Sequence, residues 1–146
     1  MKTTVKEFLD HKDKTVWTID SEATVYDALV KMAKKDIGAL VVINKTNKVV
    51  GIFSERDYAR KVVLYGKTSK ESMVNELMTR EITVAKPEST LDECMQLLSK
   101  KHIRHLPVLE GEELVGVVTI RDVLKQIIED QQLTIHNLED YIYGRI

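Results

Sequence analysis

A hydroxyl residue, an arginine and an aspartate occur at the same spacing in two places along the chain. The residues are Ser54, Arg56 and Asp57 within GIFSERDYAR, and Thr119, Arg121 and Asp122 within GVVTIRDVLK. A hydroxyl donates to a phosphate oxygen, and an arginine adds fixed positive charge with bidentate geometry. An ionised aspartate accepts hydrogen bonds from a vicinal diol such as ribose. The motifs therefore predict a nucleotide site.

The same residues also have a purely structural interpretation. Ser or Thr followed three residues later by Asp is an ordinary helix cap, and a duplicated gene duplicates its caps. The neighbouring charges favour the nucleotide instead. Arg60 comes one helical turn after Asp57, and the KTSK segment at 67–70 adds further cations and hydroxyls.

The charge around the two motifs differs. Arg104 and His105 precede a strand that should pair with the strand ending at Thr119. The equivalent positions of the first half hold Gly38 and Ala39. We therefore expect two unequal sites, of which the second is better supplied for phosphate.

The motifs occupy equivalent positions of an internal repeat. Ser54 and Thr119 are 65 residues apart, and upstream the match continues with an offset of 66. The repeats are placed at 1–68 and 69–132, followed by a helical tail at 133–146. Because a unit of about 60 residues is marginally stable alone, we expect the two sheets to pack face to face around a pseudo-twofold axis.

Each half has the pattern β-α-β-β-α, an α/β (α+β) fold class. Thr24 and Thr90 each precede an apolar stripe at helical spacing. The apolar runs at 38–43 and 105–109 suit buried strands, and a turn and a second apolar run predict a hairpin after each. Each motif then lies where the last strand meets the last helix, whose N-terminus offers free N–H groups and a positive dipole.

Composition limits the class of protein. Lys and Arg total 22 against 23 Asp and Glu. The cations are scattered, whereas a nucleic-acid-binding protein needs a one-sided basic face, so we do not expect a nucleic-acid partner. Cys94 is the only cysteine, which excludes an intramolecular disulfide and a Cys-rich zinc site. No apolar run approaches the about 18–20 residues of a membrane span, and the N-terminus lacks a signal-like apolar core. We expect a soluble cytoplasmic protein.

Metal binding and catalysis find little support in the sequence. His102 and His105 are three residues apart but have no obvious carboxylate or cysteine partner except the distant Cys94. Phosphate-loop, dinucleotide and nucleophile-elbow motifs are absent, and no nucleophile–base pair is evident. We expect neither a metal site nor an enzyme.

The motifs resemble the cystathionine β-synthase (CBS) domain. In the second half the resemblance rests on Ile82-Thr83-Val84, IRHLPV, LVGVVT and the Thr-x-x-Asp ending, and in the first half on Ile19, GALVV, VVGIFS and Ser-x-x-Asp. The chain from about 5 to 130 resembles a tandem CBS pair, or Bateman module, with two β-α-β-β-α CBS repeats. The SERDYARKVVLYGKTSK segment is similar to a bacterial group of stand-alone pairs.

The resemblance implies a regulatory sensor of adenosine ligands, bound in clefts between the halves. AMP is the first ligand expected, with NAD(H) or ATP next, and ADP and S-adenosylmethionine are ligands of the family. The aspartates would bind ribose, and the arginines would face phosphate. Adenine would lie near Ile19, Ile37 and Ala39 in one cleft. In the other cleft it would lie near Val84, Ile103 and His105.

The whole set implied to bind nucleotide consists of apolar residues, backbone positions and the polar residues of the motifs. Its members are Ile19, Ile37, Gly38, Ala39, Ser54, Arg56, Asp57, Arg60, Thr83, Val84, Ile103, Arg104, His105, Pro107, Thr119, Arg121 and Asp122. Gly38 stands where the second half has Arg104, so the first site should prefer a less charged ligand or stay empty.

The resemblance also implies a homodimer and a downstream protein whose identity is open. The tail carries an apolar stripe of Leu133, Ile135, Leu138 and Ile142. This stripe predicts a helix that either folds back on its own domain or contacts a dimer partner. An alternative function for the whole chain is a constitutive protein-interaction module with vestigial pockets.

Overall fold

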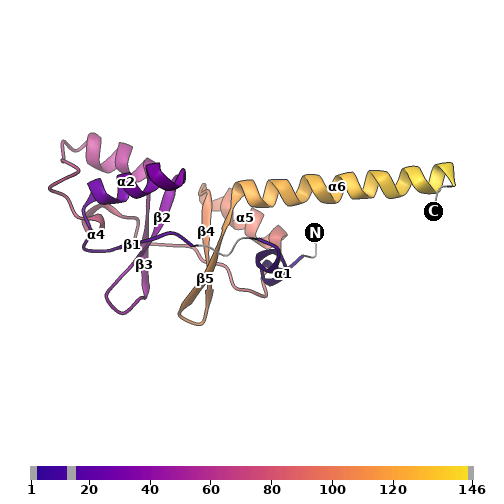
Figure 1. The fold of residues 1–146 in the computed structure, drawn as a ribbon, viewed down its shortest axis with the longest axis horizontal. Coiled ribbons are helices and arrows are strands. Elements are labelled where there is room, and N and C mark those ends of the chain that lie inside the picture. The colour runs from indigo at the N-terminus through magenta and orange to yellow at the C-terminus, as the bar shows by residue number, and fades with distance from the viewer. Residues whose placement is uncertain (1–2, 13–15, 145–146) are drawn as a thin grey trace.

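A computed structural model describes residues 3–12 and 16–144 (Figure 1). The first half follows the predicted order, with its second helix divided into a short α-helix and a π-helical segment. Its elements are β1 (Thr18–Asp20), α2 (Val25–Lys35), β2 (Ala39–Ile43), β3 (Val49–Ser54), α3 (Glu55–Asp57) and η1 (Tyr58–Val63). Strand β1 pairs with β2 in parallel, and β2 pairs with β3 as an antiparallel hairpin.

The second half repeats this order, but its first strand is shortened and its last helix is continuous. Its elements are α5 (Leu91–Lys101), β4 (His105–Glu110), β5 (Glu113–Thr119) and α6 (Ile120–Tyr143). Its first strand is reduced to one parallel bridge between Ala85 and Val108. In the first half the Val41 N–H donates to Trp17 at 3.4 Å. The equivalent of Val41 is Pro107, which has no N–H, so this part of the ladder is lost.

Both halves build their helices with the same local signals. The side chains of Thr24 and Thr90 accept from the backbone N–H three residues on and so cap α2 and α5. Both helices end at a left-handed residue, Asp36 or His102. The two hairpins also share a register shift at equivalent positions, between Val42 and Ile43 and between Val108 and Leu109. The repeat therefore extends to the details of backbone pairing.

Two hydrophobic cores form, and each includes a short helix from the other half of the sequence. Helix α1 (Val5–Asp10) contributes Val5 and Leu9 to the core of the second half. Helix α4 (Val74–Leu77) contributes Val74 and Leu77 to the core of the first half. The two halves of the sequence thus exchange one helix each, and the fold does not divide cleanly between residues 68 and 69.

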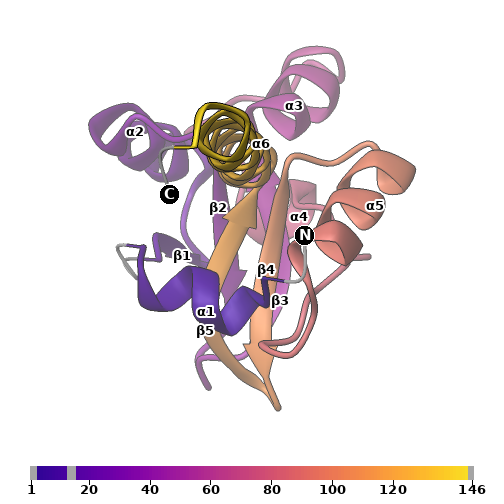
Figure 2. The same cartoon turned by 90° about the vertical axis from the view of Figure 1, so that its right-hand side faces the viewer.

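The two sheets face each other, as the sequence predicts: in Figure 2 the hairpin of β4 and β5 lies in front of the hairpin of β2 and β3. The hairpin turns point the same way in both views (Figures 1 and 2). A salt bridge of 3.2 Å between Lys48 and Glu112 links the two turns. Helices α2 and α5 and the start of α6 lie at the opposite end of the strands. Among the described residues, no helix combines the length and apolar character that crossing a membrane requires.

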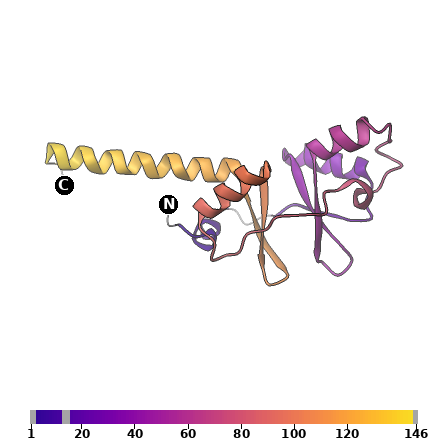
Figure 3. The same ribbon diagram turned by 180° about the vertical axis from the view of Figure 1, so that it is seen from behind.

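Helix α6 continues without a break through the predicted boundary at 132/133 and projects beyond the body (Figure 3). Val123 is its one buried residue among those described. The tail therefore does not fold back on its own domain. The last two residues of the predicted tail, 145–146, lie outside the described residues.

Candidate functional site

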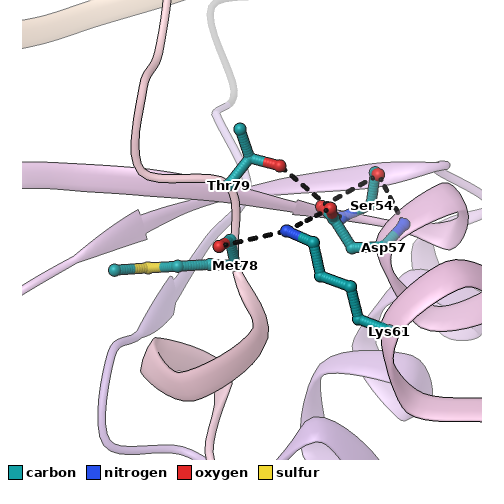
Figure 4. Close-up of polar contacts among 5 residues, drawn as sticks. All are labelled: Ser54, Asp57, Lys61, Met78 and Thr79. Carbon is teal, nitrogen blue, oxygen red and sulfur yellow. Dashed lines mark hydrogen bonds and ion pairs between the residues drawn. The ribbon is translucent and has the colours of Figure 1, made fainter. Parts of the chain in front are cut away.

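The first motif forms a reciprocal helix cap (Figure 4). The Asp57 backbone N–H donates to the Ser54 hydroxyl at 3.2 Å. In return, Oδ2 of Asp57 accepts from the Ser54 backbone N–H at 3.0 Å and from the Ser54 hydroxyl at 3.1 Å. Asp57 is only 6% exposed. The capping interpretation of this motif therefore holds for the structure described here.

The other oxygen of Asp57 binds residues outside the motif. Oδ1 accepts from the Thr79 hydroxyl at 2.9 Å and lies 3.2 Å from Nζ of Lys61, which also reaches the Met78 carbonyl at 3.4 Å. A carboxylate has about four lone-pair sites, so these contacts use all of them. Lys61 lies one turn after Asp57 and was identifiable from that spacing, whereas Thr79 comes from the other half and gave no local signal.

The second motif repeats the cap with a different cation. The Asp122 N–H donates to the Thr119 hydroxyl at 3.1 Å, and Oδ2 of Asp122 accepts from the Thr119 N–H at 3.0 Å. The same oxygen lies 2.7 Å from Nζ of Lys12, which also donates to the Val117 carbonyl at 3.0 Å. The repeat position of Lys61 holds Gln126, so the second aspartate obtains its cation from the N-terminal segment.

A cleft of about 880 Å³ lies between the halves at the first motif. Both halves contribute charged and polar side chains to it. Its walls are formed by Gly38, Ile52, Ser54, Glu55, Arg56, Asp57, Arg60, Lys61, Thr79, Glu81, Ile82, Thr83, Lys101, His102, Ile103, Arg104 and His105. Five of these are Lys or Arg and three are Asp or Glu, so the walls carry a net positive charge that suits an anionic ligand.

The cleft collects nine of the residues that the sequence predicted. They are Gly38, Ser54, Arg56, Asp57, Arg60, Thr83, Ile103, Arg104 and His105. Arg104 lies beside the second motif, as the predicted strand pairing requires, since its carbonyl accepts from the Ile120 N–H at 3.0 Å. It also lines the cleft of Asp57, which the sequence did not predict. A hydrogen bond of 2.8 Å from Arg56 to the His102 carbonyl holds the two halves together at this point.

The other predicted residues lie outside the walls of this cleft. Ile19 and Ile37 pack against the first core, and Ala39 pairs with Ser54 at the start of the first hairpin. Val84 lies in the loop before Ala85, and Pro107 is buried in β4. Thr119, Arg121 and Asp122 lie at the start of α6. The sequence missed Lys61, Thr79 and Lys101 in the cleft and Lys12 at the second motif.

His105 lies between the two motifs and has a perturbed pKa. Burial lowers this pKa from its ordinary value of 6.5, the Arg104 charge lowers it further, and Asp122 and Glu55 partly oppose these effects. The imidazole is therefore predominantly neutral at neutral pH, and His105 lines the cleft. No group of three His, Cys, Asp or Glu side chains that could hold a metal ion occurs within residues 3–12 and 16–144.

A repeated fold with a ligand-sized cleft between its halves defines the structural class. The family model of the CBS domain matches residues 5–64 and 74–129. The chain therefore belongs to the CBS-domain family, whose members are commonly regulatory and ligand-binding.

Known proteins similar to this chain agree with that assignment. The mitochondrial CBS domain-containing protein CBSX3 of Arabidopsis thaliana is 35% identical, over 97% of this chain and 73% of that protein. The structure of a putative signal-transduction protein with CBS domains from Burkholderia ambifaria is 44% identical with a TM-score of 0.83, covering 88% of this chain and 96% of that one. The hexameric CBS-CP12 protein from bloom-forming cyanobacteria is 30% identical with a TM-score of 0.74, covering 85% and 67%.

Proposed function

We propose that this protein binds an adenine nucleotide in the cleft between Asp57 and Arg104 and acts as a regulatory sensor without enzymatic activity. AMP is the first ligand proposed, followed by NAD(H), ATP and ADP. The observation that carries the proposal is the cleft itself. Its volume of about 880 Å³ is in the range of small-molecule sites, and its cations come from both halves.

The distribution of charge orients the proposed ligand. Arg56, Arg60 and Arg104 supply guanidinium groups suited to bidentate phosphate binding, and Lys101 adds a point charge. Ile82 and Ile103 offer apolar surface to a base. Ribose would then lie at Asp57, between the base and the phosphate.

Ribose binding at Asp57 requires one of the present donors to leave the carboxylate. The Thr79 hydroxyl, at 2.9 Å from Oδ1, is the closest chemical match to a ribose hydroxyl. Exchanging one neutral hydroxyl donor for another keeps the buried carboxylate satisfied, so the exchange costs little. Displacing Lys61 would cost more, because it removes the charge that faces Asp57 across 3.2 Å.

The proposed signal is a change in how the halves are held together. The Arg56 contact with the His102 carbonyl crosses the cleft. A phosphate that binds Arg56 would compete with that carbonyl. A ligand that engages both halves therefore has different affinities for closed and open arrangements, which is the condition for shifting a conformational equilibrium. We propose that this shift changes a surface of the homodimer and that a downstream protein binds the changed surface.

A constitutive interaction module is the second candidate. It is favoured by the complete set of donors around Asp57, which is a satisfied cap even with no ligand bound. This candidate predicts that nucleotides leave the melting temperature unchanged. The sensor predicts a rise, since a ligand at 100 times its dissociation constant adds about 2.7 kcal/mol to the free energy of unfolding.

The decisive experiment combines two measurements on the full chain. Mass spectrometry of small molecules released from purified protein identifies a ligand carried from the cell. Thermal unfolding with AMP, ADP, ATP, NAD(H) and adenosine then ranks affinities. A melting temperature that no nucleotide raises would contradict the proposal and support the interaction module. Chromatography of the recovered nucleotide tests the absence of turnover, and consumption of the nucleotide would indicate an enzyme.

A further inference from the structure

The second half of α6 is a helix that extends away from the body. No residue from Gln131 to Glu139 is buried or half-buried, and the helix runs on to Tyr143. Figure 1 shows this arm beyond both halves of the fold. Isolated helices of about 12–15 residues are marginal in water. A surface that covers one face of the arm would supply the missing stabilisation.

One narrow stripe runs along the exposed face of α6. Its members alternate in spacing between four and three residues, the pattern of a coiled-coil heptad. They are Leu124, Ile128, Gln131, Ile135, Leu138 and Ile142. We call these six residues the α6 seam. Its five apolar side chains are between 45% and 72% exposed in the single chain.

The α6 seam begins in a shallow groove along the first turns of α6 itself. This groove has a volume of about 590 Å³ and is lined by Ile120, Arg121, Leu124, Lys125, Ile128 and Glu129. Leu124 and Ile128 therefore belong to both the groove and the α6 seam. Apart from Gln131, apolar seam residues continue along the same face of α6 from this groove to its last turn.

From this arrangement we infer that α6 pairs in parallel with α6 of a second copy of the chain, through the α6 seam. In heptad terms Ile128, Ile135 and Ile142 occupy the a positions. Leu124 and Leu138 occupy the d positions. Isoleucine at the a positions with leucine at the d positions favours a parallel coiled coil of two helices.

Gln131 supports the parallel direction. In a parallel pair, the same residue of each copy forms one layer, so the two Gln131 amides can hydrogen-bond to each other and hold the register. An antiparallel pair in the matching register would place Gln131 opposite Ile135. In that arrangement the Gln131 amide of each copy is buried against an isoleucine. Both amides then lack a hydrogen-bonding partner, which is unfavourable.

The size and position of the α6 seam suit a second copy. At about 1.5 Å per residue, the stretch from Leu124 to Ile142 is roughly 27 Å long. Two such faces bury on the order of 1,000 Å², the size at which specific interfaces begin. Val123, which is buried against its own body, points about 100° away from Leu124. A twofold axis along the helices therefore places the two bodies on opposite sides.

The first test compares Leu138→Glu with Leu133→Glu by analytical ultracentrifugation of the full chain. The two leucines are similarly exposed, at 57% and 60%, but Leu133 lies on the opposite face of α6 from Leu124. Leu138→Glu removes an apolar contact from both copies and should raise the dimer dissociation constant by about 100-fold or more. Leu133→Glu should leave it unchanged. Neither substitution touches a core.

The second test uses cross-linking to determine whether the two α6 helices pair in parallel. Leu138→Cys should form a disulfide-linked dimer under mild oxidation, because parallel pairing brings equivalent d positions together. Leu133→Cys should not. Burial raises the pKa of the native Cys94 thiol to about 11, which keeps it unreactive in the folded chain. Any disulfide-linked dimer is therefore formed by the introduced cysteine.

The two tests give clear outcomes, and neither depends on nucleotide binding. Preferential cross-linking of Leu138→Cys supports the inference, even if the bodies also associate. A wild-type monomer at micromolar concentration would overturn it and leave the α6 seam to a different protein. A dimer in which Leu138→Cys cross-links no faster than Leu133→Cys would also overturn it, since the pair is then antiparallel or forms through the body.

Discussion

The Nζ atom of Lys12 lies 2.7 Å from Oδ2 of Asp122 and joins the N-terminal segment to the first turn of α6. The ion pair of Asp57 with Lys61 neutralises the first aspartate locally, between α3 and the adjoining η1. Equivalent aspartates of the repeat thus receive their cations from unrelated places in the sequence. One pair is local, and the other crosses the whole chain.

Replacing Lys12 with Met should destabilise the fold by about 1–2 kcal/mol, because Asp122 loses a charge-assisted hydrogen bond at a half-buried position. The side chains of Lys12 and Asp122 are 29% and 19% exposed, so water compensates only in part. Urea denaturation measures the change. Lys6→Met, an exposed substitution on the neighbouring α1, is the control. Equal midpoints for the two variants would show that the ion pair contributes nothing.

Replacing Arg104 with Ala should weaken AMP binding by roughly 10- to 150-fold, the effect of losing a hydrogen bond to a charged group. Adenosine, which has no phosphate, should bind the variant almost as well as the wild type. Isothermal titration calorimetry with both ligands measures the difference. Arg121→Ala serves as a comparison because Arg121 lies outside the cleft. Equal losses for AMP and adenosine would argue against a phosphate role for Arg104.

His105 should make stability depend on pH below about 6.5. Burial lowers its pKa in the folded chain, so below 6.5 the unfolded chain binds the proton more readily. The free energy of unfolding therefore falls as the pH drops through 6.5 towards the folded pKa, and it is constant above. His105→Gln should lose this part of the slope, whereas the exposed His11→Gln should keep it. Urea midpoints between pH 8 and 5 test this, and identical slopes in both variants would refute it.

Gly51→Ala should cost more stability than Gly116→Ala. A Cβ at residue 51 would lie 2.7 Å from the Thr79 carbonyl oxygen, which is backbone, and 2.7 Å from Sδ of Met78. For a Cβ at residue 116 the three nearest atoms all belong to the Leu9 side chain, the closest at 2.8 Å, and this side chain can rotate away. Overpacking costs about 1–3 kcal/mol. Thermal unfolding ranks the two variants, and the reverse order would mean that the segment after α4 adjusts more easily than Leu9.

Much of the local structure was predictable from short stretches of sequence. The capped helices after Thr24 and Thr90, the hairpins and the Ser–Asp and Thr–Asp caps all depend on residues within a few positions of one another. The repeat then predicted that both halves share one fold, and the CBS-domain assignment followed from the same residues. Even the interrupted first strand of the second half follows from the local sequence, because Pro107 and Pro87 stand where Val41 and Ser21 donate backbone N–H groups in the first half.

The composition of the site depended on contacts between distant parts of the chain. Strand pairing placed Arg104 beside the second motif, and the packing of the halves brings it to the cleft of Asp57 as well. Thr79 reaches Asp57 because α4 joins the core of the first half, and Lys12 reaches Asp122 because α1 joins the core of the second. The amino-acid sequence by itself determined the repeated elements and their caps, since these arise from hydrogen bonds between near neighbours. Only the tertiary structure decided which charges meet, because that depends on burying two apolar cores at once and on the exchange of short helices that this burial requires.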